Sequence, residues 1–193
     1  MVTANGDGAA VSVLLGDGWR GLRAAHRLQH GHLPLVVAIA DLNRDGKPDL
    51  VVVNNFSNSV SVLLGHNDGT FGPRTDFLTG SSPASLAVGD LNGDGTLDVV
   101  TASKFANIVS VLINTASMGQ ATPSFAPRTE FATGNGPIGI AIGDLNRDHK
   151  LDVVTANRSS NTVAVLLGSR AGGSARTRTT RRAAVPPPSR LPT

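Results

Sequence analysis

Three short acidic segments are the residues whose types and spacing could bind a metal ion. We name them loop one (residues 41–49, DLNRDGKPD), loop two (residues 90–98, DLNGDGTLD) and loop three (residues 144–152, DLNRDHKLD). Each loop carries aspartate or asparagine at its first, third, fifth and ninth positions. Calcium takes about six to eight oxygen ligands, which carboxylates and carbonyls supply. The spacing therefore predicts three calcium sites.

Five residues in each loop form the predicted coordination shell. Four of them offer side-chain oxygens, and the residue at position seven offers its main-chain carbonyl. Without a cation the aspartates would repel one another, by about 4 kcal/mol for two carboxylates about 4 Å apart at an effective dielectric of about 20. The predicted ligands are Asp41, Asn43, Asp45, Lys47 and Asp49; Asp90, Asn92, Asp94, Thr96 and Asp98; and Asp144, Asn146, Asp148, Lys150 and Asp152.

Position six of each loop should adopt a positive φ, because the chain must wrap tightly around the ion. Gly46 and Gly95 allow this conformation without steric cost. Loop three has His149 at this position, where a side chain introduces strain. We therefore expect loop three to be the weakest of the three sites.

Two alternatives compete with a calcium-binding strand connection. The first is a hairpin turn rich in Asp and Asn that carries no metal. The second is an EF-hand, whose loop begins in the same way but has a bidentate Glu at position twelve between two helices. Position twelve is Val52, Thr101 and Thr155 here, within β-branched runs. The same test disfavours a dockerin-like helical repeat, so we expect the loops to join strands.

The loops recur at a nearly constant spacing. Asp41 and Asp90 are 49 residues apart, and Asp90 and Asp144 are 54 apart, with the extra five residues within Thr115–Ser124. Periods of this length are typical of propellers, solenoids and arrays. A parallel β-helix is the second choice, although its repeats are usually shorter.

Each repeat unit contains four short β-branched or alternating segments bounded by turn residues. Four strands per unit predict an all-β fold, a partial β-propeller of four-stranded antiparallel blades with the calcium loops between strands one and two. The expected strands are Val36–Ala40, Leu50–Val53, Val60–Leu64 and Thr75–Thr79; Ser85–Gly89, Val99–Thr101, Val109–Ile113 and Thr129–Thr133; and Gly139–Gly143, Val153–Thr155 and Val163–Leu167.

The two ends of the chain depart from the repeat. Trp19–His32 replaces the expected fourth strand with a basic stretch that is compatible with a helix, and residues 169–193 are rich in Pro and Arg. We hypothesise that both stretches are reading-frame errors. The predicted division is a divergent partial blade (1–33), two full blades (34–82 and 83–136), a partial blade (137–168) and a disordered basic tail (169–193).

Composition narrows the classes of function. The net charge of +3 comes from six Arg in residues 169–193; without them 11 basic residues face 14 acidic ones, a net charge of −3. The Arg-rich tail lacks interleaved aromatic residues, so we expect no nucleic-acid partner. There is no cysteine, no apolar stretch of about 20 residues that could span a membrane and no visible secretory signal. We find no catalytic triad, no acid–base pair outside the loops and no phosphate loop, and expect no enzyme activity.

The loop and strand motifs resemble those of the FG-GAP/VCBS repeat family. The resemblance is carried by Gly89–Val100 (GDLNGDGTLDVV), Val60–Gly65 (VSVLLG) and Asp68–Pro73 (DGTFGP), and extends over residues 33–168 with a partial match over residues 2–16. These repeats are similar to the blades of the integrin α-subunit propeller. The resemblance implies a calcium-stabilised propeller, usually of about seven blades.

The family also implies a setting outside the cell. We expect a secreted or cell-surface, non-enzymatic module for adhesion or ligand binding, with an extracellular protein or glycan as its partner. Open blade edges would also favour self-association. Two alternatives remain open: an accessory or carbohydrate-binding domain of a secreted carbohydrate-active enzyme, and an inert fragment of a larger propeller protein.

Overall fold

The computed structural model describes residues 1–5, 10–16, 22–29, 33–169 and 177–181. All regular structure in these residues is β-strand, and the strands form four separate antiparallel sheets. Within these residues we find no helix with the length and apolar character needed to cross a membrane. The predicted all-β fold class is confirmed.

Each sheet is a meander of strands in chain order, and we name the sheets A to D. Neighbouring strands pair in the order in which they occur in the sequence. Sheet A contains β1 (Val2–Asn5), β2 (Ala10–Gly16) and β3 (Leu22–Gln29); sheet B contains β4 (Pro34–Ala40), β5 (Asp49–Asn54), β6 (Ser59–Leu63) and β7 (Thr75–Leu78); sheet C contains β8 (Pro83–Gly89), β9 (Asp98–Ser103), β10 (Ile108–Leu112) and β11 (Thr129–Ala132); and sheet D contains β12 (Pro137–Gly143), β13 (Asp152–Asn157), β14 (Thr162–Leu166) and β15 (Thr177–Arg181).

The first strand of sheets B, C and D begins with a proline followed by a register shift. Each of these prolines (Pro34, Pro83 and Pro137) pairs with the last residue of the next strand, and the pairing slips by one residue immediately afterwards. Proline cannot donate a backbone hydrogen bond, so it is tolerated at a strand start or a bulge. The three prolines therefore mark equivalent points of the repeat.

The hydrophobic core lies between the sheets, in a separate cluster at each interface. In β5, Val51 and Val53 join residues of sheet C, whereas Leu50 and Val52 join Val11 and Val13 of sheet A. Successive side chains of a strand point to opposite faces, so an unbroken apolar run buries both faces of the sheet. A third cluster joins sheets C and D through residues such as Val100 and Val153.

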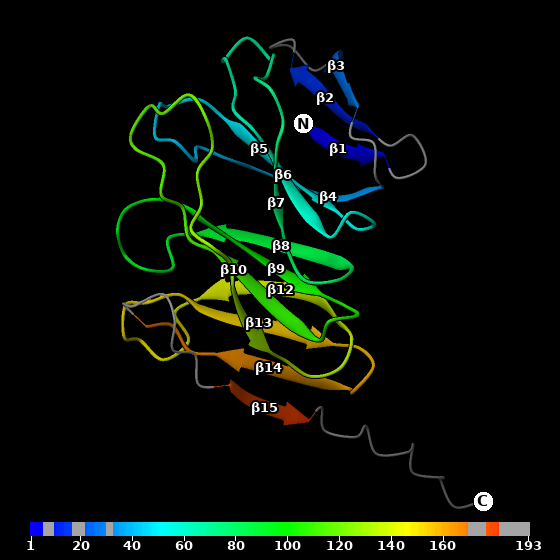
Figure 1. The fold of residues 1–193 in the computed structure, drawn as a ribbon, viewed down its shortest axis with the longest axis vertical. Helices are drawn as coiled ribbons and strands as arrows, with labels where there is room; N and C mark the ends of the chain where they lie inside the picture. Colours follow the sequence, from blue (N-terminus) through cyan, green and yellow to red (C-terminus); the bar gives the residue numbers. More distant parts are fainter. Residues whose placement is uncertain (6–9, 17–21, 30–32, 170–176, 182–193) are drawn as a thin grey trace, which may run out of the picture.

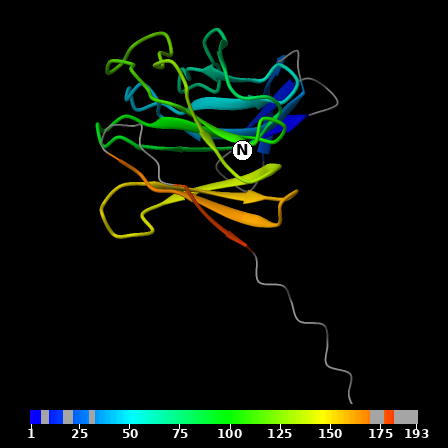
Figure 2. The same ribbon diagram turned by 60° about the horizontal axis from the view of Figure 1, so that its bottom comes forward.

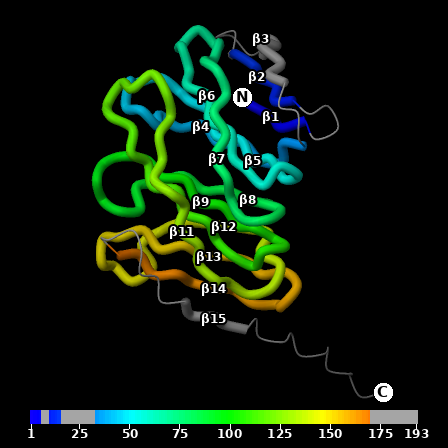
Figure 3. Tube along the Cα trace, in the orientation of Figure 1, coloured from blue at the N-terminus to red at the C-terminus, as the bar shows by residue number. Residues whose placement is uncertain are grey.

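The sheets follow one another in an open arc. Figure 1 shows sheet A at one end of the molecule and sheet D at the other, with sheets B and C between them. The tube in Figure 3 follows the same path from blue to orange, and the turned view in Figure 2 separates sheet D from the sheets above it. The first strands β4, β8 and β12 contact one another in series. This places loops one, two and three beside each other.

The strands expected from the sequence are present, and their ends differ by no more than two residues from those predicted. The two chain ends differ from expectation. Leu22–Gln29 is not helical but forms β3, which pairs with β2.

The prediction of disorder is wrong for residues 177–181. They form β15, which pairs with β14 and gives sheet D a fourth strand. The backbone of this segment can complete the sheet because the exposed edge of β14 offers unpaired N–H and C=O groups. The remaining parts of the predicted tail, residues 170–176 and 182–193, lie outside the described residues, as do residues 17–21 and 30–32 of the divergent first blade.

Candidate functional site

The three acidic loops connect the first strand to the second strand of sheets B, C and D. Each begins at the end of the first strand, and its ninth residue is the first residue of β5, β9 or β13. The backbone at position six has positive φ in all three, with values of 79° at Gly46, 83° at Gly95 and 63° at His149. The predicted turn geometry is therefore confirmed, including at the histidine.

The aspartate at position nine is buried and anchors the loop. In loop one, the two carboxylate oxygens of Asp49 accept hydrogen bonds from the N–H of Leu42 (2.8 Å) and of Gly65 (2.8 Å). The same pair of bonds holds Asp98 (from Leu91 N–H at 2.9 Å and Asn114 N–H at 2.8 Å) and Asp152 (from Leu145 N–H at 2.9 Å and Gly168 N–H at 2.8 Å). Each anchor therefore joins the loop to the end of the third strand.

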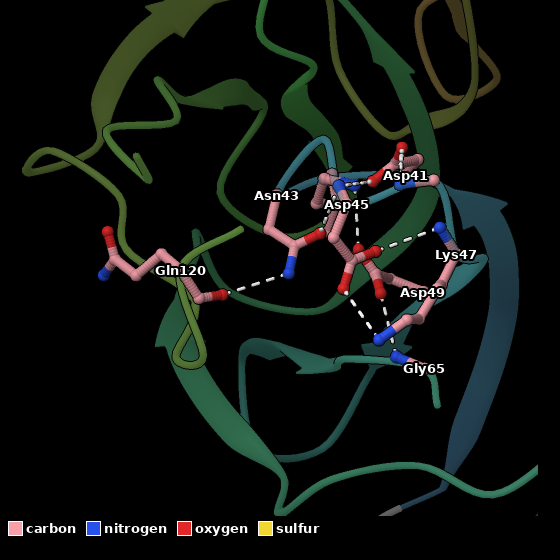
Figure 4. Close-up of polar contacts among 9 residues, drawn as sticks. Asp41, Asn43, Asp45, Lys47, Asp49, Gly65 and Gln120 are labelled. Carbon is pink, nitrogen blue, oxygen red and sulfur yellow. Dashed lines mark hydrogen bonds and ion pairs between the residues drawn. The ribbon is translucent and has the colours of Figure 1, made fainter. Parts of the chain in front are cut away.

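The aspartates and asparagine at positions one, three and five organise the turn itself, as Figure 4 shows for loop one. The carboxylate of Asp41 accepts from Asp45 N–H (3.1 Å) and Gly46 N–H (2.9 Å). The Asn43 side-chain oxygen also accepts from Asp45 N–H, at 3.2 Å. Loops two and three repeat these bonds through Asp90, Asn92, Asp144 and Asn146.

The position-five aspartates accept hydrogen bonds from the position-seven residues, whose carbonyls are the predicted backbone ligands. Lys47 N–H, Thr96 N–H and Lys150 N–H donate to Asp45, Asp94 and Asp148 at 2.9, 2.7 and 3.0 Å. The lysine ammonium groups also approach these carboxylates, at 3.5 Å for Lys47–Asp45 and 3.4 Å for Lys150–Asp148. In loop two the Thr96 hydroxyl donates to Asp94 instead.

The donor chemistry of the loops fits calcium, although the acid groups are turned towards backbone amides. Among the residues that the structure describes, no three His, Cys, Asp or Glu side chains gather closely enough to hold a metal ion. Each predicted side-chain ligand nevertheless offers an oxygen atom. A carboxylate oxygen that accepts one hydrogen bond keeps a second lone pair, which a cation could use. Three carboxylates, one amide oxygen and one carbonyl per loop match the preference of a hard cation. Calcium would be held by the fifteen residues predicted from the sequence.

Burial makes the carboxylates of Asp98 and Asp49 electrostatically costly. Asp98 has no exposed surface, and burial raises its pKa to about 6 despite the hydrogen bonds from Asn114 and Leu91. The negative charges of Asp94 and Asp90 raise the pKa further. Burial and the charges of Asp45 and Asp41 likewise raise the pKa of Asp49. Charged groups in such settings are normally paired or metal-bound, because desolvation favours the neutral form.

The position-five carboxylates behave in the opposite way. Desolvation opposes the ionisation of Asp45, but hydrogen bonds from Lys47 and Asn43 outweigh it and lower the pKa. Hydrogen bonds also lower the pKa values of Asp94 and Asp148 against the effect of desolvation. Each loop therefore contains carboxylates that stay ionised in a wide range of pH, and a cation is attracted to that charge.

The loops differ in how far the neighbouring sheet covers them. Asn43 of loop one is buried, whereas its equivalent Asn92 in loop two is half-buried and Asn146 in loop three is exposed. A cleft of about 680 Å³ separates loops two and three, and it is lined by residues of both, including Asp90, Asp144 and His149. The loops thus form one acidic face along the arc.

Sequence reasoning missed the residues that cover loop one. The Asn114 side chain donates to the carbonyl of Leu42 at 2.7 Å, and Gly119 N–H donates to the carbonyl of Asn43 at 2.7 Å. The carbonyl of Gln120 accepts from the side-chain amide of Asn43 at 3.0 Å, as Figure 4 shows. The one available signal was the five-residue insertion within residues 115–124, which breaks the repeat where Asn114 replaces a glycine.

Comparison with known proteins supports the repeat and the fold. Residues 41–101 match the family model described as FG-GAP-like repeat, a span that includes loops one and two. No curated protein matches the chain in sequence.

Two solved structures share the arrangement of sheets. One is a protein of unknown function from Desulfotomaculum acetoxidans, with a TM-score of 0.63 and 15% identity, covering 92% of this chain and 54% of that chain. The other is a protein provisionally assigned as a 6-phosphogluconolactonase from Bacteroides uniformis, with a TM-score of 0.64 and 13% identity, covering 89% of this chain and 48% of that chain.

At such identities the likeness shows the fold alone, which is β-propeller-like. The chain spans about half the length of each of these two structures. Residues 41–101 are therefore an FG-GAP-like repeat, within an all-β chain whose sheets are arranged like the blades of a propeller.

Proposed function

We propose that the chain is a calcium-binding, non-enzymatic propeller module of the FG-GAP type. The observation that carries the proposal is the buried aspartate at position nine of each loop. Among the described residues, no lysine, arginine or histidine forms an ion pair with Asp49, Asp98 or Asp152. A bound divalent cation would supply the missing positive charge in an oxygen-rich site.

The proposed role of calcium is structural. Each loop joins the first strand to the second strand of a sheet, and the position-nine aspartate also holds the end of the third strand. A cation shared by positions one to nine would therefore fix three strands of one blade together. Binding to the native state alone raises the free energy of unfolding in proportion to the logarithm of calcium concentration.

The proposed setting is extracellular, where calcium is abundant. Loops of this kind can function there with dissociation constants of about 10⁻⁴–10⁻³ M. The acidic face formed by the loops, with the cleft between loops two and three, is the surface that we propose presents calcium-dependent contacts to a protein or glycan ligand. Adhesion or ligand binding at the cell surface, or in a secreted protein, is the function that this arrangement supports best.

Isothermal titration of the calcium-free full chain with CaCl₂ tests the proposal. We expect three bound ions in the wild type and two in each of the variants Asp45→Ala, Asp94→Ala and Asp148→Ala, because each variant removes a central carboxylate from one loop. Asp76→Ala is the matched control, since Asp76 is an exposed aspartate outside the loops. Absence of stoichiometric calcium uptake by folded wild-type protein would contradict the proposal.

A further inference from the structure

Asn114 contacts loop one and loop two at once. Its side-chain Nδ2 donates to the carbonyl of Leu42 in loop one (2.7 Å) and to the carbonyl of Leu97 in loop two (3.0 Å). Its backbone N–H donates to Asp98 at 2.8 Å, and its Oδ1 accepts from Ala116 N–H at 2.9 Å. The residue is only 4% exposed. Both amide donors, one acceptor and the backbone N–H are therefore engaged in a buried site.

The side chain at this position is a special feature of sheet C. The equivalent residues in sheets B and D are Gly65 and Gly168, whose N–H groups make the same bond to Asp49 and Asp152. A Cβ atom would clash with the carbonyl oxygen of Pro48 at Gly65 and with that of Leu151 at Gly168, so the other two sheets leave no room for a side chain. Only in sheet C, within the described repeats, can this position reach a neighbouring loop.

The insertion that follows Asn114 continues the contact with loop one. Gly119 N–H donates to the backbone carbonyl of Asn43, and the side-chain amide of Asn43 donates to the carbonyl of Gln120. The Asn43 side-chain nitrogen is held by Gln120, while its oxygen accepts from Asp45 N–H, a bond that Asn92 and Asn146 also make in the other two loops. Asn43 is 3% exposed as a result. The predicted ligand Asn43 of loop one is thus held by residues of sheet C through its side-chain nitrogen and its backbone carbonyl.

We propose that Asn114 is a positioning residue that couples loop one to loop two, so that a cation bound at one loop raises the affinity of the other. The proposal rests on the proposed calcium binding. A cation in loop two would fix Asp98, and Asp98 holds the backbone of Asn114. Asn114 in turn holds Leu42, which lies between the predicted ligands Asp41 and Asn43.

The coupling must act in both directions. Linkage requires that loop one change the affinity of loop two by the same factor, which for coupled sites is typically about 5–150-fold. Loop three should be uncoupled through this route, because the equivalent position in sheet D is Gly168. The proposal therefore predicts cooperativity between two of the three loops.

A double-mutant cycle followed by NMR tests the coupling. Calcium is titrated into the full chain, and the amide signals of Asn43 and Asn146 report the dissociation constants of loops one and three separately. Asp94→Ala disables loop two. We expect Asp94→Ala to weaken calcium binding at loop one about fivefold or more in the wild-type background and less than about twofold in the Asn114→Gly background. Loop three should be unaffected in both backgrounds.

Two further variants separate coupling from folding. Asn114→Gly installs the residue found at the equivalent positions, and Asn114→Asp keeps the size and the acceptor while removing both side-chain donors. Both should abolish the coupling. In calcium-free protein, both should speed amide hydrogen exchange in loop one relative to loop three, because both remove the bond from the Asn114 side chain to the carbonyl of Leu42.

The outcomes distinguish the two proposals. If calcium binds but Asp94→Ala leaves the affinity of loop one unchanged, the coupling is overturned while the proposed function stands. If no loop of the wild type binds calcium, the proposed function fails. If, in addition, Asn114→Gly leaves amide hydrogen exchange in calcium-free loop one unchanged, the structural link between loops one and two is overturned as well.

Discussion

The carboxylate of Asp49 accepts a 2.8 Å hydrogen bond from the N–H of Gly65, sixteen residues further along the chain. Bonds of the same length and separation join Asp98 to Asn114 and Asp152 to Gly168. The last aspartate of each loop therefore has a structural role that is independent of any metal. It connects the start of the second strand to the end of the third.

This role predicts that Asp98 and Asp94 contribute differently to stability when calcium is absent. Asp98→Ala leaves two buried N–H groups, of Leu91 and Asn114, without an acceptor, which should lower the free energy of unfolding by about 2–5 kcal/mol. Asp94→Ala removes an exposed side chain and should cost less than about 1 kcal/mol. Urea unfolding in excess chelator measures both. Equal effects of the two variants would contradict the anchoring role.

The titration of Asp98 should distinguish it from Asp94 of the same loop. Burial raises the pKa of Asp98 to about 6, whereas hydrogen bonds lower that of Asp94 below 3.8 against desolvation. Carboxylate ¹³C chemical shifts of the calcium-free protein measure both values. Saturating calcium should lower the pKa of Asp98, because a nearby cation favours the ionised form. A calcium-free Asp98 that titrates near 3.8 would show that burial does not govern this group.

The raised pKa of Asp98 makes the free energy of unfolding depend on pH. Between pH 3.8 and about 6 the folded protein keeps a proton on Asp98 that the unfolded chain releases. The contribution of Asp98 to the free energy of unfolding therefore falls as pH rises through this window, by about 3 kcal/mol at most, and the cost is fully present above it.

This dependence can be isolated by substitution. Asp98→Asn removes the titrating group, so the difference in unfolding free energy between wild type and variant should change across this window in calcium-free buffer. Calcium should reduce the change. A constant difference between pH 4 and pH 6.5 would contradict the assignment.

Position six offers a matched pair of backbone tests. His149 holds a φ of 63°, which costs a residue with a Cβ atom about 1 kcal/mol or more, so His149→Gly should raise the calcium affinity of loop three. Gly95→Ala should weaken loop two, although nothing lies within 4 Å of the added Cβ atom, because the φ of 83° disfavours a side chain. Calcium titration of both variants decides whether backbone strain sets the order of affinities.

The core between the sheets should be sensitive to lost volume. Val100 has no exposed surface and lies in the cluster that joins sheets C and D. Val100→Ala should lower the free energy of unfolding by about 1–3 kcal/mol through lost burial and the cavity left behind. Thermal unfolding measures the effect, and Thr129→Ala, at an exposed strand position, is the control. A loss no larger than that of the control would show that this interface is loosely packed.

Much of the fold was predictable because the repeat carries its own evidence. β-branched runs such as the one that contains Val51 and Val52 mark the buried strands, and three in-register copies of the acidic loop fix where strand one ends and strand two begins. The position-six φ values followed from Gly46 and Gly95 by the same logic.

The unpredicted features depend on contacts between distant residues or on backbone pairing that tolerates almost any sequence. Asn114 and Leu42 are 72 positions apart, and nothing local to either residue reveals the contact. The strand β15 has no strong strand signal in its sequence, yet its backbone extends sheet D. The anchoring role of Asp98 was hidden because the proposed ligand role and the anchor require the same residue type.

The calcium dependence of the melting temperature tests the central claim most directly, that cations in the acidic loops stabilise the folded chain. Each filled loop should add about 1.4 kcal/mol at a calcium concentration ten times its dissociation constant. We therefore predict that calcium raises the melting temperature of the wild type. It should raise that of Asp94→Ala by a smaller amount, and that of the triple variant Asp45→Ala/Asp94→Ala/Asp148→Ala not at all. A wild-type melting temperature that is the same in millimolar calcium and in chelator would contradict the account.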